Sequence, residues 1–152
     1  MKKLQLSLII GLFFTIFSFA QTIQSPSEFL GYELGSRFSN HHKVVDYFLY
    51  VSEASKSVKL QKYGETNEHK PLYVSYISSE ENIVTLEKIR EANLKRTGII
   101  QGTPNSEIGI VWLSYNVHGN EASSSEAAML TLYKLITEKQ DWLKNTLVII
   151  DP

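Results

Sequence analysis

The stretch that decides the fold is IGIVWLSYNVHGNEASSSEAAMLTLYKLI, residues 108–136. Its first half is a nearly continuous apolar run with many β-branched and aromatic side chains, which predicts a strand buried on both faces. Its second half predicts a helix, because apolar residues recur there at helical spacing. The apolar side of this helix consists of Ala128, Leu132, Leu135 and Ile136, widened by Met129 and Tyr133.

The segment HGNE, residues 118–121, lies where this strand gives way to the helix. Ligands bind at the carboxyl ends of strands in open α/β sheets, and catalytic zinc sites commonly combine two His and one Glu with a water. We expect His118 to be the last residue of the strand and Glu121 to follow one short turn later. Gly119 would let the chain turn tightly between them, because it carries no Cβ. Water bound to such an ion has a pKa near 7 and becomes a nucleophile.

A second interpretation of the same segment stays open on the residues alone. Gly119-Asn120 can form an ordinary turn, and Glu121 can interact favourably with the dipole at the start of the helix. The chain has four His and 13 Glu among 152 residues, so chance alone gives about 0.34 His-x-x-Glu pairs. The location after a buried strand is what favours a metal site with His118 and Glu121 as ligands.

Residues 1–20 are typical of a secretory signal peptide. Lys2 and Lys3 are followed by an apolar stretch, and Ser18-Phe19-Ala20 supplies small residues at the cleavage site. An uncleaved N-terminal anchor is the alternative. The sequence contains no Cys, which excludes a lipoprotein anchor, disulfides and thiolate ligands. We therefore expect a secreted or periplasmic protein without a stable membrane anchor.

Charge and size restrict the remaining chain further. Without residues 1–20, 132 residues carry 13 basic and 16 acidic side chains, a net charge of about −3. Because no basic patch or basic-aromatic stripe is present, nucleic acid is not an expected partner. A chain of this size can form one domain.

The first part of the mature chain combines a lead-in with one helix. Residues 21–38 predict an extended lead-in held by aromatic contacts. Ser39 or Asn40 can cap a helix that runs to about Ser55. The adjacent His41 and His42 point in different directions from its first turn and make a poor joint metal site. The expected buried side of this helix is Val44, Val45, Phe48 and Leu49.

Alternation of apolar and polar residues predicts strands at 57–63 and 72–78, which form a β-hairpin at one edge of a sheet. The segment Ser78-Ser79-Glu80-Glu81 has capping-box spacing and opens one helix to about Lys95, ended by Gly98. The inner side of this helix is expected to be Ile83, Leu86, Ile89, Arg90 and Leu94.

After the helix that ends near Lys139, the segment TLVIID, residues 146–151, predicts a second buried strand. Two buried strands joined by a helix form a parallel pair. A parallel sheet needs helices on both faces, and the sequence supplies too few for a second layer. We therefore expect residues 39–152 to be the N-terminal portion of a larger α/β domain.

The run VHGNEASSSEAAML, followed by NTLVIIDP, resembles the zinc metallocarboxypeptidases of the carboxypeptidase A type. The segment YGETNEHKPLYVSYIS resembles the early hairpin of that family, with His69 in place of the usual Gly. The similarity covers roughly residues 44–152, and the lead-in and the helix expected from Glu80 to about Lys95 are similar to large secreted bacterial members. The resemblance implies a three-layer α/β/α fold with a mixed sheet, incomplete in this chain.

The resemblance also implies roles for particular residues. His118 and Glu121 match the first two zinc ligands of the family. The third ligand, the general-base Glu and the substrate-binding residues are expected after Pro152, so no catalytic residue is assigned within this chain. Glu126 is assigned to the helix surface or to a buried hydrogen bond. The implied whole protein is a zinc-dependent peptidase acting on peptides or proteins, and this chain alone is expected to be inactive.

Two other functions remain open from the sequence. The aspartoacylase and desuccinylase group also carries HGNE in a similar fold and removes an acyl group from an amino acid. A secreted binding domain on the same scaffold, without catalytic residues, is the non-enzymatic alternative. The signal peptide and the hairpin pattern favour the peptidase.

Overall fold

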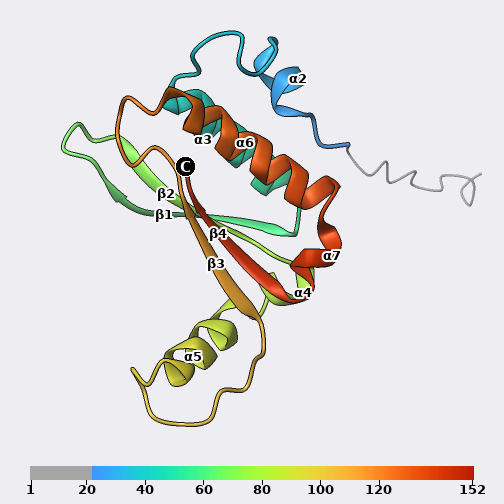
Figure 1. Ribbon diagram of the computed structural model, residues 1–152, viewed down its shortest axis with the longest axis vertical. Helices are drawn as coiled ribbons and strands as arrows, with labels where there is room; N and C mark the ends of the chain where they lie inside the picture. Colours follow the sequence, from blue (N-terminus) through green and yellow to red (C-terminus); the bar gives the residue numbers. More distant parts are fainter. Residues whose placement is uncertain (1–21) are drawn as a thin grey trace, which may run out of the picture.

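The computed structural model describes residues 22–152, so the expected signal peptide lies outside the described residues. No helix within this range is long and apolar enough to cross a membrane. The chain forms short helices and long helices around one sheet (Figure 1). The elements are α2 (Pro26–Leu30), α3 (His41–Ala54), β1 (Val58–Glu65), β2 (Pro71–Ile77), α4 (Glu80–Ile83), α5 (Leu86–Arg96), β3 (Gly109–Ser114), α6 (Ala122–Thr137), α7 (Gln140–Leu143) and β4 (Thr146–Asp151).

The four strands form one mixed sheet in the order β1-β2-β4-β3. β1 and β2 form the expected antiparallel hairpin at one edge, and β2 also pairs antiparallel with β4. β3 and β4, which α6 connects, are parallel, with Val111 opposite Val148. The expected α/β class and mixed sheet are therefore confirmed. The carboxyl ends of β3 and β4 and the start of β2 lie together at one end of the strands, which we call the carboxyl edge of the sheet.

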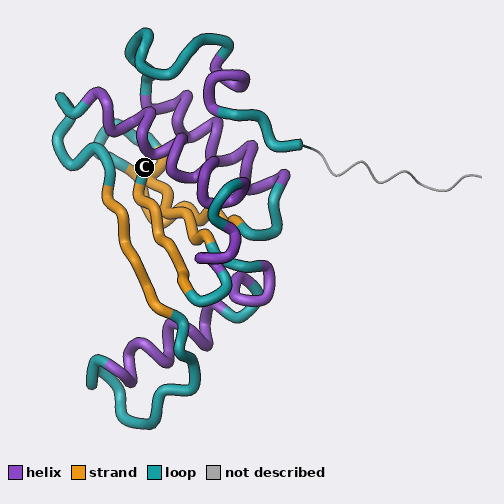
Figure 2. The backbone as a smooth tube through the Cα atoms, turned by 45° about the vertical axis from the view of Figure 1, so that its right-hand side comes forward, coloured by secondary structure: helices purple, strands orange, loops and turns teal. Residues whose placement is uncertain are grey.

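The hydrophobic core lies between one face of the sheet and the helices α3 and α6, which form one layer (Figures 1 and 2). The apolar side predicted for α6 is the side that packs into this core. On α3, Leu49 is only half-buried, whereas Tyr47 and Val51 complete the buried side. The largest fully buried side chains are Tyr47, Phe48, Ile77, Met129, Leu132, Leu143 and Ile150.

The opposite face of the sheet is only partly covered, by α5 at one end (Figure 2). The prediction that β3 is buried on both faces is wrong, because β3 is an edge strand and Trp112 is 66% exposed. Its parallel neighbour β4 lies between two strands, and Leu147, Val148 and Ile150 are buried there. Burial of these two apolar strands is thus decided by their place in the sheet.

The lead-in contains a helix, so its expected fully extended form is wrong. Ser25 caps α2 through a capping box, in which its hydroxyl accepts from the Glu28 N–H at 3.3 Å and the Glu28 carboxylate accepts from the Ser25 N–H at 2.7 Å. The expected aromatic contacts are present. The Phe29 ring lies 5.2 Å from that of Tyr47 and 5.3 Å from that of Tyr50.

The single helix expected from residue 80 to about Lys95 is two helices, α4 and α5, separated at Val84 and Thr85. Ser79, and not Ser78, caps α4. The third residue of α4 is therefore Asn82 in place of a Glu, and the expected capping box is absent. The Asn82 amide instead donates to the backbone oxygens of Leu143 and Lys144, both at 3.1 Å. On α5, Arg90 is exposed and Ala92 is buried with Ile89, while Gly98 follows the helix end with φ 76° as expected.

Candidate metal centre

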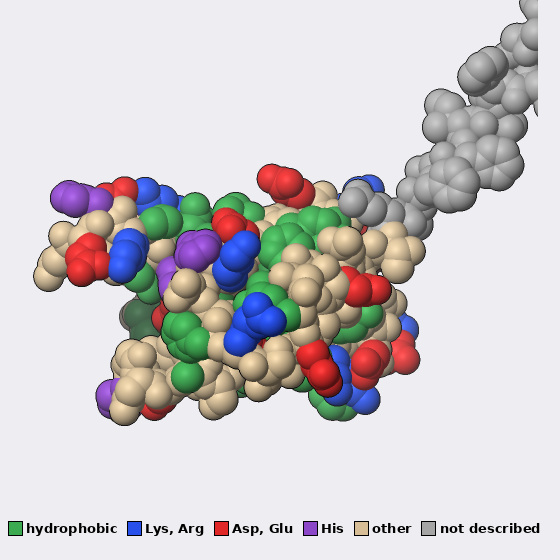
Figure 3. All heavy atoms as spheres, turned by 90° about the horizontal axis from the view of Figure 1, so that it is seen from above, with side chains coloured by type: hydrophobic (Ala, Val, Ile, Leu, Met, Phe, Trp, Pro, Cys, Tyr) green, Lys and Arg blue, Asp and Glu red, His purple; other side chains and the backbone are tan. Residues whose placement is uncertain are grey.

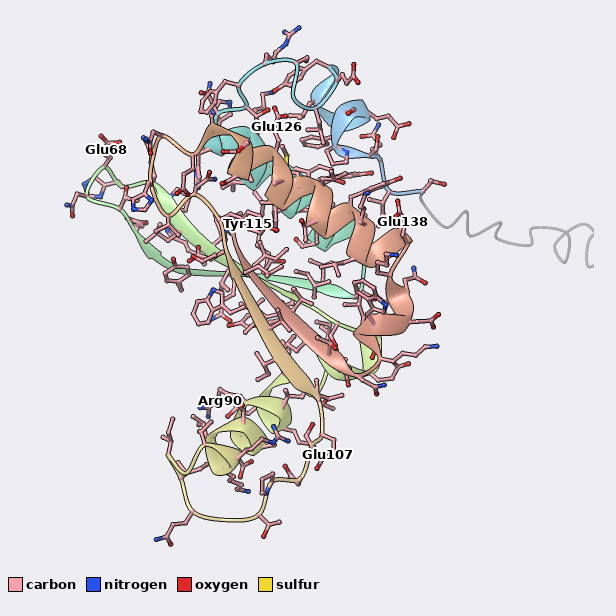
Figure 4. All side chains as sticks on the ribbon, in the orientation of Figure 1. Glu68, Arg90, Glu107, Tyr115, Glu126 and Glu138 are labelled. Carbon is pink, nitrogen blue, oxygen red and sulfur yellow. The ribbon has the colours of Figure 1, made fainter. Side chains whose placement is uncertain are left out.

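The loop between β3 and α6 carries the predicted metal ligands. β3 ends at Ser114, which pairs with Asp151, and the next residue is fixed when the Tyr115 N–H donates to the Asp151 carbonyl at 2.9 Å. The Tyr115 hydroxyl lies 2.9 Å from Oγ1 of Thr131 on α6, and the labelled side chain points from the loop toward that helix (Figure 4). His118 therefore lies four residues beyond the strand. The expectation that His118 is the last residue of the strand is wrong.

The tight conformation of this loop is provided by Asn116. Its φ is 54°, in the left-handed region that Asn adopts more readily than most residues. The Ser125 hydroxyl donates to its side-chain oxygen at 3.3 Å, which ties the loop to α6. The expected tight turn is present at Gly119 and Asn120, between His118 and Glu121. Gly119 has no positive φ there, so this turn does not use a backbone conformation special to glycine.

His118 and Glu121 face each other across one turn. Nδ1 of His118 lies 2.8 Å from Oε1 of Glu121, and the backbone N–H of Glu121 donates to the His118 carbonyl at 3.0 Å. Both side chains are accessible to solvent, 73% and 39% exposed respectively. The hydrogen bond from the His118 side chain, helped by its backbone N–H, holds the pKa of the Glu121 carboxyl below its ordinary value. An imidazole nitrogen and a carboxylate oxygen thus converge at the carboxyl edge of the sheet.

The alternative interpretation of Glu121 is also partly met. Glu121 occupies the residue directly before α6, but its side chain makes no capping hydrogen bond to that helix. The carboxylate turns back to His118 instead. Its charge still lies near the positive end of the helix dipole, which favours an anion.

The other three histidines do not join this pair. His69 is 90% exposed in the hairpin loop, where its Nδ1 lies 3.7 Å from Oε2 of Glu65. His41 and His42 are surface residues at the start of α3. Partial desolvation of the His41 imidazole lowers its pKa, and the charges of Lys70 and His42 lower it further. Histidine side chains gather toward one end of the molecule in Figure 3. Within residues 22–152, however, no three His, Cys, Asp or Glu side chains converge on one point.

Asp151, the last residue of β4, is a further polar residue at this end of the sheet. Its Oδ1 accepts from the Tyr63 hydroxyl at 3.5 Å. Burial raises the pKa of Asp151, and the Tyr63 hydrogen bond opposes that rise. The signal that could have singled it out is its place at the carboxyl end of a buried strand.

Glu126 is buried and hydrogen-bonded, the second of the two roles assigned from the sequence. It is 8% exposed, and its Oε1 accepts from the Ser39 hydroxyl at 2.7 Å. Its Oε2 accepts from the Gly35 N–H. Figure 4 shows Glu126 on α6 below the loop that connects α2 to α3. No local sequence pattern indicates these contacts, because the partners are 87 and 91 residues away.

Residues 46–151 match the family of zinc carboxypeptidases. The chain belongs to this family. A solved structure of carboxypeptidase A from Helicoverpa armigera is similar to it, with a TM-score of 0.59 and 18% sequence identity. That match covers 99% of this chain and 31% of the carboxypeptidase, so the chain spans about a third of its length. No curated protein matches the chain.

The hairpin loop contains one residue in a left-handed backbone conformation. His69 has φ 59°, a conformation that glycine adopts at no steric cost. The donor atoms of His118 and Glu121 fit zinc as two of the three protein ligands that a catalytic zinc centre requires. Within residues 22–152, no third ligand stands beside them.

Proposed function

We propose that the whole protein is a zinc-dependent peptidase of the carboxypeptidase type, with His118 and Glu121 as two of its zinc ligands. The observation that carries this proposal is the 2.8 Å approach of Nδ1 of His118 to Oε1 of Glu121 at the carboxyl edge of the sheet, in a chain of the zinc carboxypeptidase family. Membership of this family supports peptides or proteins as the substrates in this proposal, and not acylated amino acids.

Each residue of the pair has a separate task in this proposal. The His118 imidazole supplies a neutral nitrogen, and Glu121 supplies a negative charge that helps to hold the cation. The bound ion would polarise the scissile carbonyl and activate water. Two hydrogen bonds fix the loop that presents them. One joins the backbones of these two residues, and the other runs from the Ser125 hydroxyl to the Asn116 side chain. A third ligand and a general base are expected from residues after Pro152 of the complete protein.

Removal of the metal tests the activity. The full-length protein should release C-terminal amino acids from peptides, lose this activity after dialysis against a chelator, and regain it with one equivalent of zinc. Unchanged hydrolysis in metal-free protein would show that the reaction is not zinc-dependent. Release of an acyl group from N-acylated amino acids, without peptide cleavage, would identify an amidohydrolase instead.

We also propose that residues 1–20 direct export and are removed after Ala20, and that residues 39–152 belong to the catalytic domain. The basic start, apolar middle and small residues at 18–20 support the cleavage. N-terminal sequencing of the exported protein tests it. A mature protein that still begins at Met1 would contradict the cleavage.

A further inference from the structure

An open cavity of about 370 Å³ lies beside the first turn of α6, directly after the proposed ligand Glu121. One wall is the start of α6, and the other is the loop that joins α2 to α3, which passes over this end of α6 (Figure 1). The lining residues are Gly35, Arg37, Phe38, Ala122, Ser123 and Glu126.

The loop wall is held in place by a buried chain of hydrogen bonds. The Ser39 hydroxyl, 1% exposed, donates to Glu126 at 2.7 Å, so it accepts from the Tyr32 hydroxyl, also at 2.7 Å. The Gly35 N–H donates to the other oxygen of Glu126. Because a satisfied buried network rigidifies its members, the Tyr32 ring and the loop around it are fixed relative to α6.

Arg37 is the one basic side chain that lines this cavity. Its guanidinium carbon lies 4.7 Å from the centre of the Tyr32 ring, a cation–π contact that orients the side chain. Arg37 is exposed, and it forms no ion pair with any residue of the range 22–152. Glu126 accepts from Ser39 and Gly35, and no hydrogen bond joins the Arg37 guanidinium to Glu126 or to another residue of the range 22–152, so its donors are free within that range.

We propose that this cavity is a substrate subsite that binds a side-chain carboxylate of the peptide, and that Arg37 determines this specificity. The planar fork of a guanidinium matches a carboxylate and can bind it with two parallel hydrogen bonds. The subsite adjoins the residue that follows Glu121, and an extended peptide advances about 3.3 Å per residue. The proposal therefore places the bound acidic residue within a few positions of the cleaved bond. This inference rests on the proposed peptidase function for the cleavage step.

The expected preference is modest. Ion pairs at exposed sites are worth about 0.2–1 kcal/mol, so a preference of up to about fivefold is expected. The charge of Glu126 acts against an approaching anion, and it limits the gain to ligands that reach Arg37 directly. Salt should weaken the preference, because the guanidinium is accessible to solvent.

The test uses the full-length protein and hexa-alanine peptides in which one Glu, or one Gln as its neutral match, moves along the sequence. All peptides keep a free C-terminus, so only the side-chain charge differs within a pair. At one or two positions the Glu peptide should show a higher kcat/KM than its Gln match, by up to about fivefold, through a lower KM at equal kcat. Arg37→Gln should remove this preference, and Arg37→Lys, which keeps the charge without the fork, should retain part of it.

Lys56→Gln is the matched control, because it removes one exposed positive charge just beyond the opposite end of α3. It should leave the Glu preference unchanged. No preference in the wild type, or the same loss in both neutral variants, would overturn the proposal. If the wild type cleaves none of the peptides, the peptidase proposal fails by itself. Dissociation constants of the same Glu and Gln peptides, measured calorimetrically, then decide the role of Arg37 by the same comparison.

Discussion

Nδ1 of His118 lies 2.8 Å from Oε1 of Glu121, with both side chains accessible to solvent. Because a carboxylate only accepts, the proton between the two atoms belongs to the imidazole, and a cation that binds both atoms replaces that proton. His118→Ala in the full-length protein should therefore abolish stoichiometric zinc and peptide hydrolysis. Glu121→Gln should have a similar effect, because the neutral amide lacks the charge that holds the cation. Elemental analysis and release of C-terminal amino acids are the measurements.

A second exposed His–Glu pair supplies the control for this prediction. His69 lies 3.7 Å from Glu65 in the hairpin loop, and Asn tolerates its φ of 59°. His69→Asn should keep full zinc content and activity. Retention of full zinc in His118→Ala would show that HGNE is not the metal site, and Glu121 would then have only its role at the start of α6.

The sequence predicted the positions of the helices and strands better than it predicted their burial. The runs that became β3 and β4 are equally apolar, yet β4 is central and β3 is an edge strand with Trp112 exposed. Composition shows that a segment can be buried, but its neighbours in the sheet decide whether it is. The end of β3 was misplaced for a related reason, because it is set by the pairing of Ser114 with Asp151 on a strand 37 residues later.

The candidate site was predictable where it is local. His118 and Glu121 are three residues apart, so one turn brings them together, and the motif together with its place after an apolar strand was sufficient to propose the pair. Glu126 and its partners Ser39 and Gly35 are separated by most of the chain. Their contact follows from the packing of the lead-in on α6, which no local pattern encodes.

Stability should depend on the buried carboxylate of Glu126. Glu126→Ala removes the acceptor for the Ser39 hydroxyl and the Gly35 N–H. A buried donor left without a partner costs about 1–3 kcal/mol, so the free energy of unfolding should fall by about that amount. Urea unfolding of both proteins measures the difference. Glu138→Ala, an exposed change at the other end of α6, should alter stability by less than about 0.5 kcal/mol, and an equal loss in both variants would contradict the role of the buried network.

The titration of Asp151 should respond to Tyr63. Burial raises the pKa of Asp151, whereas the Tyr63 hydrogen bond lowers it. Tyr63→Phe should therefore raise this pKa further, as measured by the carboxyl carbon shift in an NMR titration. Because the folded pKa is raised, the protonated acid contributes stability below its ordinary pKa of about 3.9, and this contribution is lost as the pH rises through the folded pKa.

Tyr76→Phe is the matched control for this titration. Tyr76 lines the same cavity as Tyr63 on the open face of the sheet, but no hydrogen bond joins it to Asp151 among the described residues. Its loss of a hydroxyl should leave the Asp151 midpoint unchanged. A midpoint that stays fixed in Tyr63→Phe, or that moves equally in both variants, would show that the 3.5 Å contact does not act on the carboxyl group.

The open face of the sheet should make residues 22–152 self-associate when they are produced alone. Trp112 is 66% exposed on the edge strand β3, and it lines an apolar cavity with Tyr63, Val74, Tyr76 and Ile149. An unpaired apolar edge strand is a template for pairing with another chain. Trp112→Lys should therefore shift the protein toward monomer in size-exclusion chromatography with light scattering, because a charged side chain on an edge strand opposes pairing.

Trp142→Lys distinguishes this edge from general hydrophobicity. Trp142 is 63% exposed, similar to Trp112, but it lies on α7 with Lys139 stacked over its ring at 5.0 Å. It is not part of the sheet, so its replacement should leave self-association unchanged, while both variants keep the thermal stability of the parent within about 0.5 kcal/mol. Equal effects of the two substitutions would assign the association to exposed apolar area in general, and a monomeric parent chain would show that the edge of β3 does not pair.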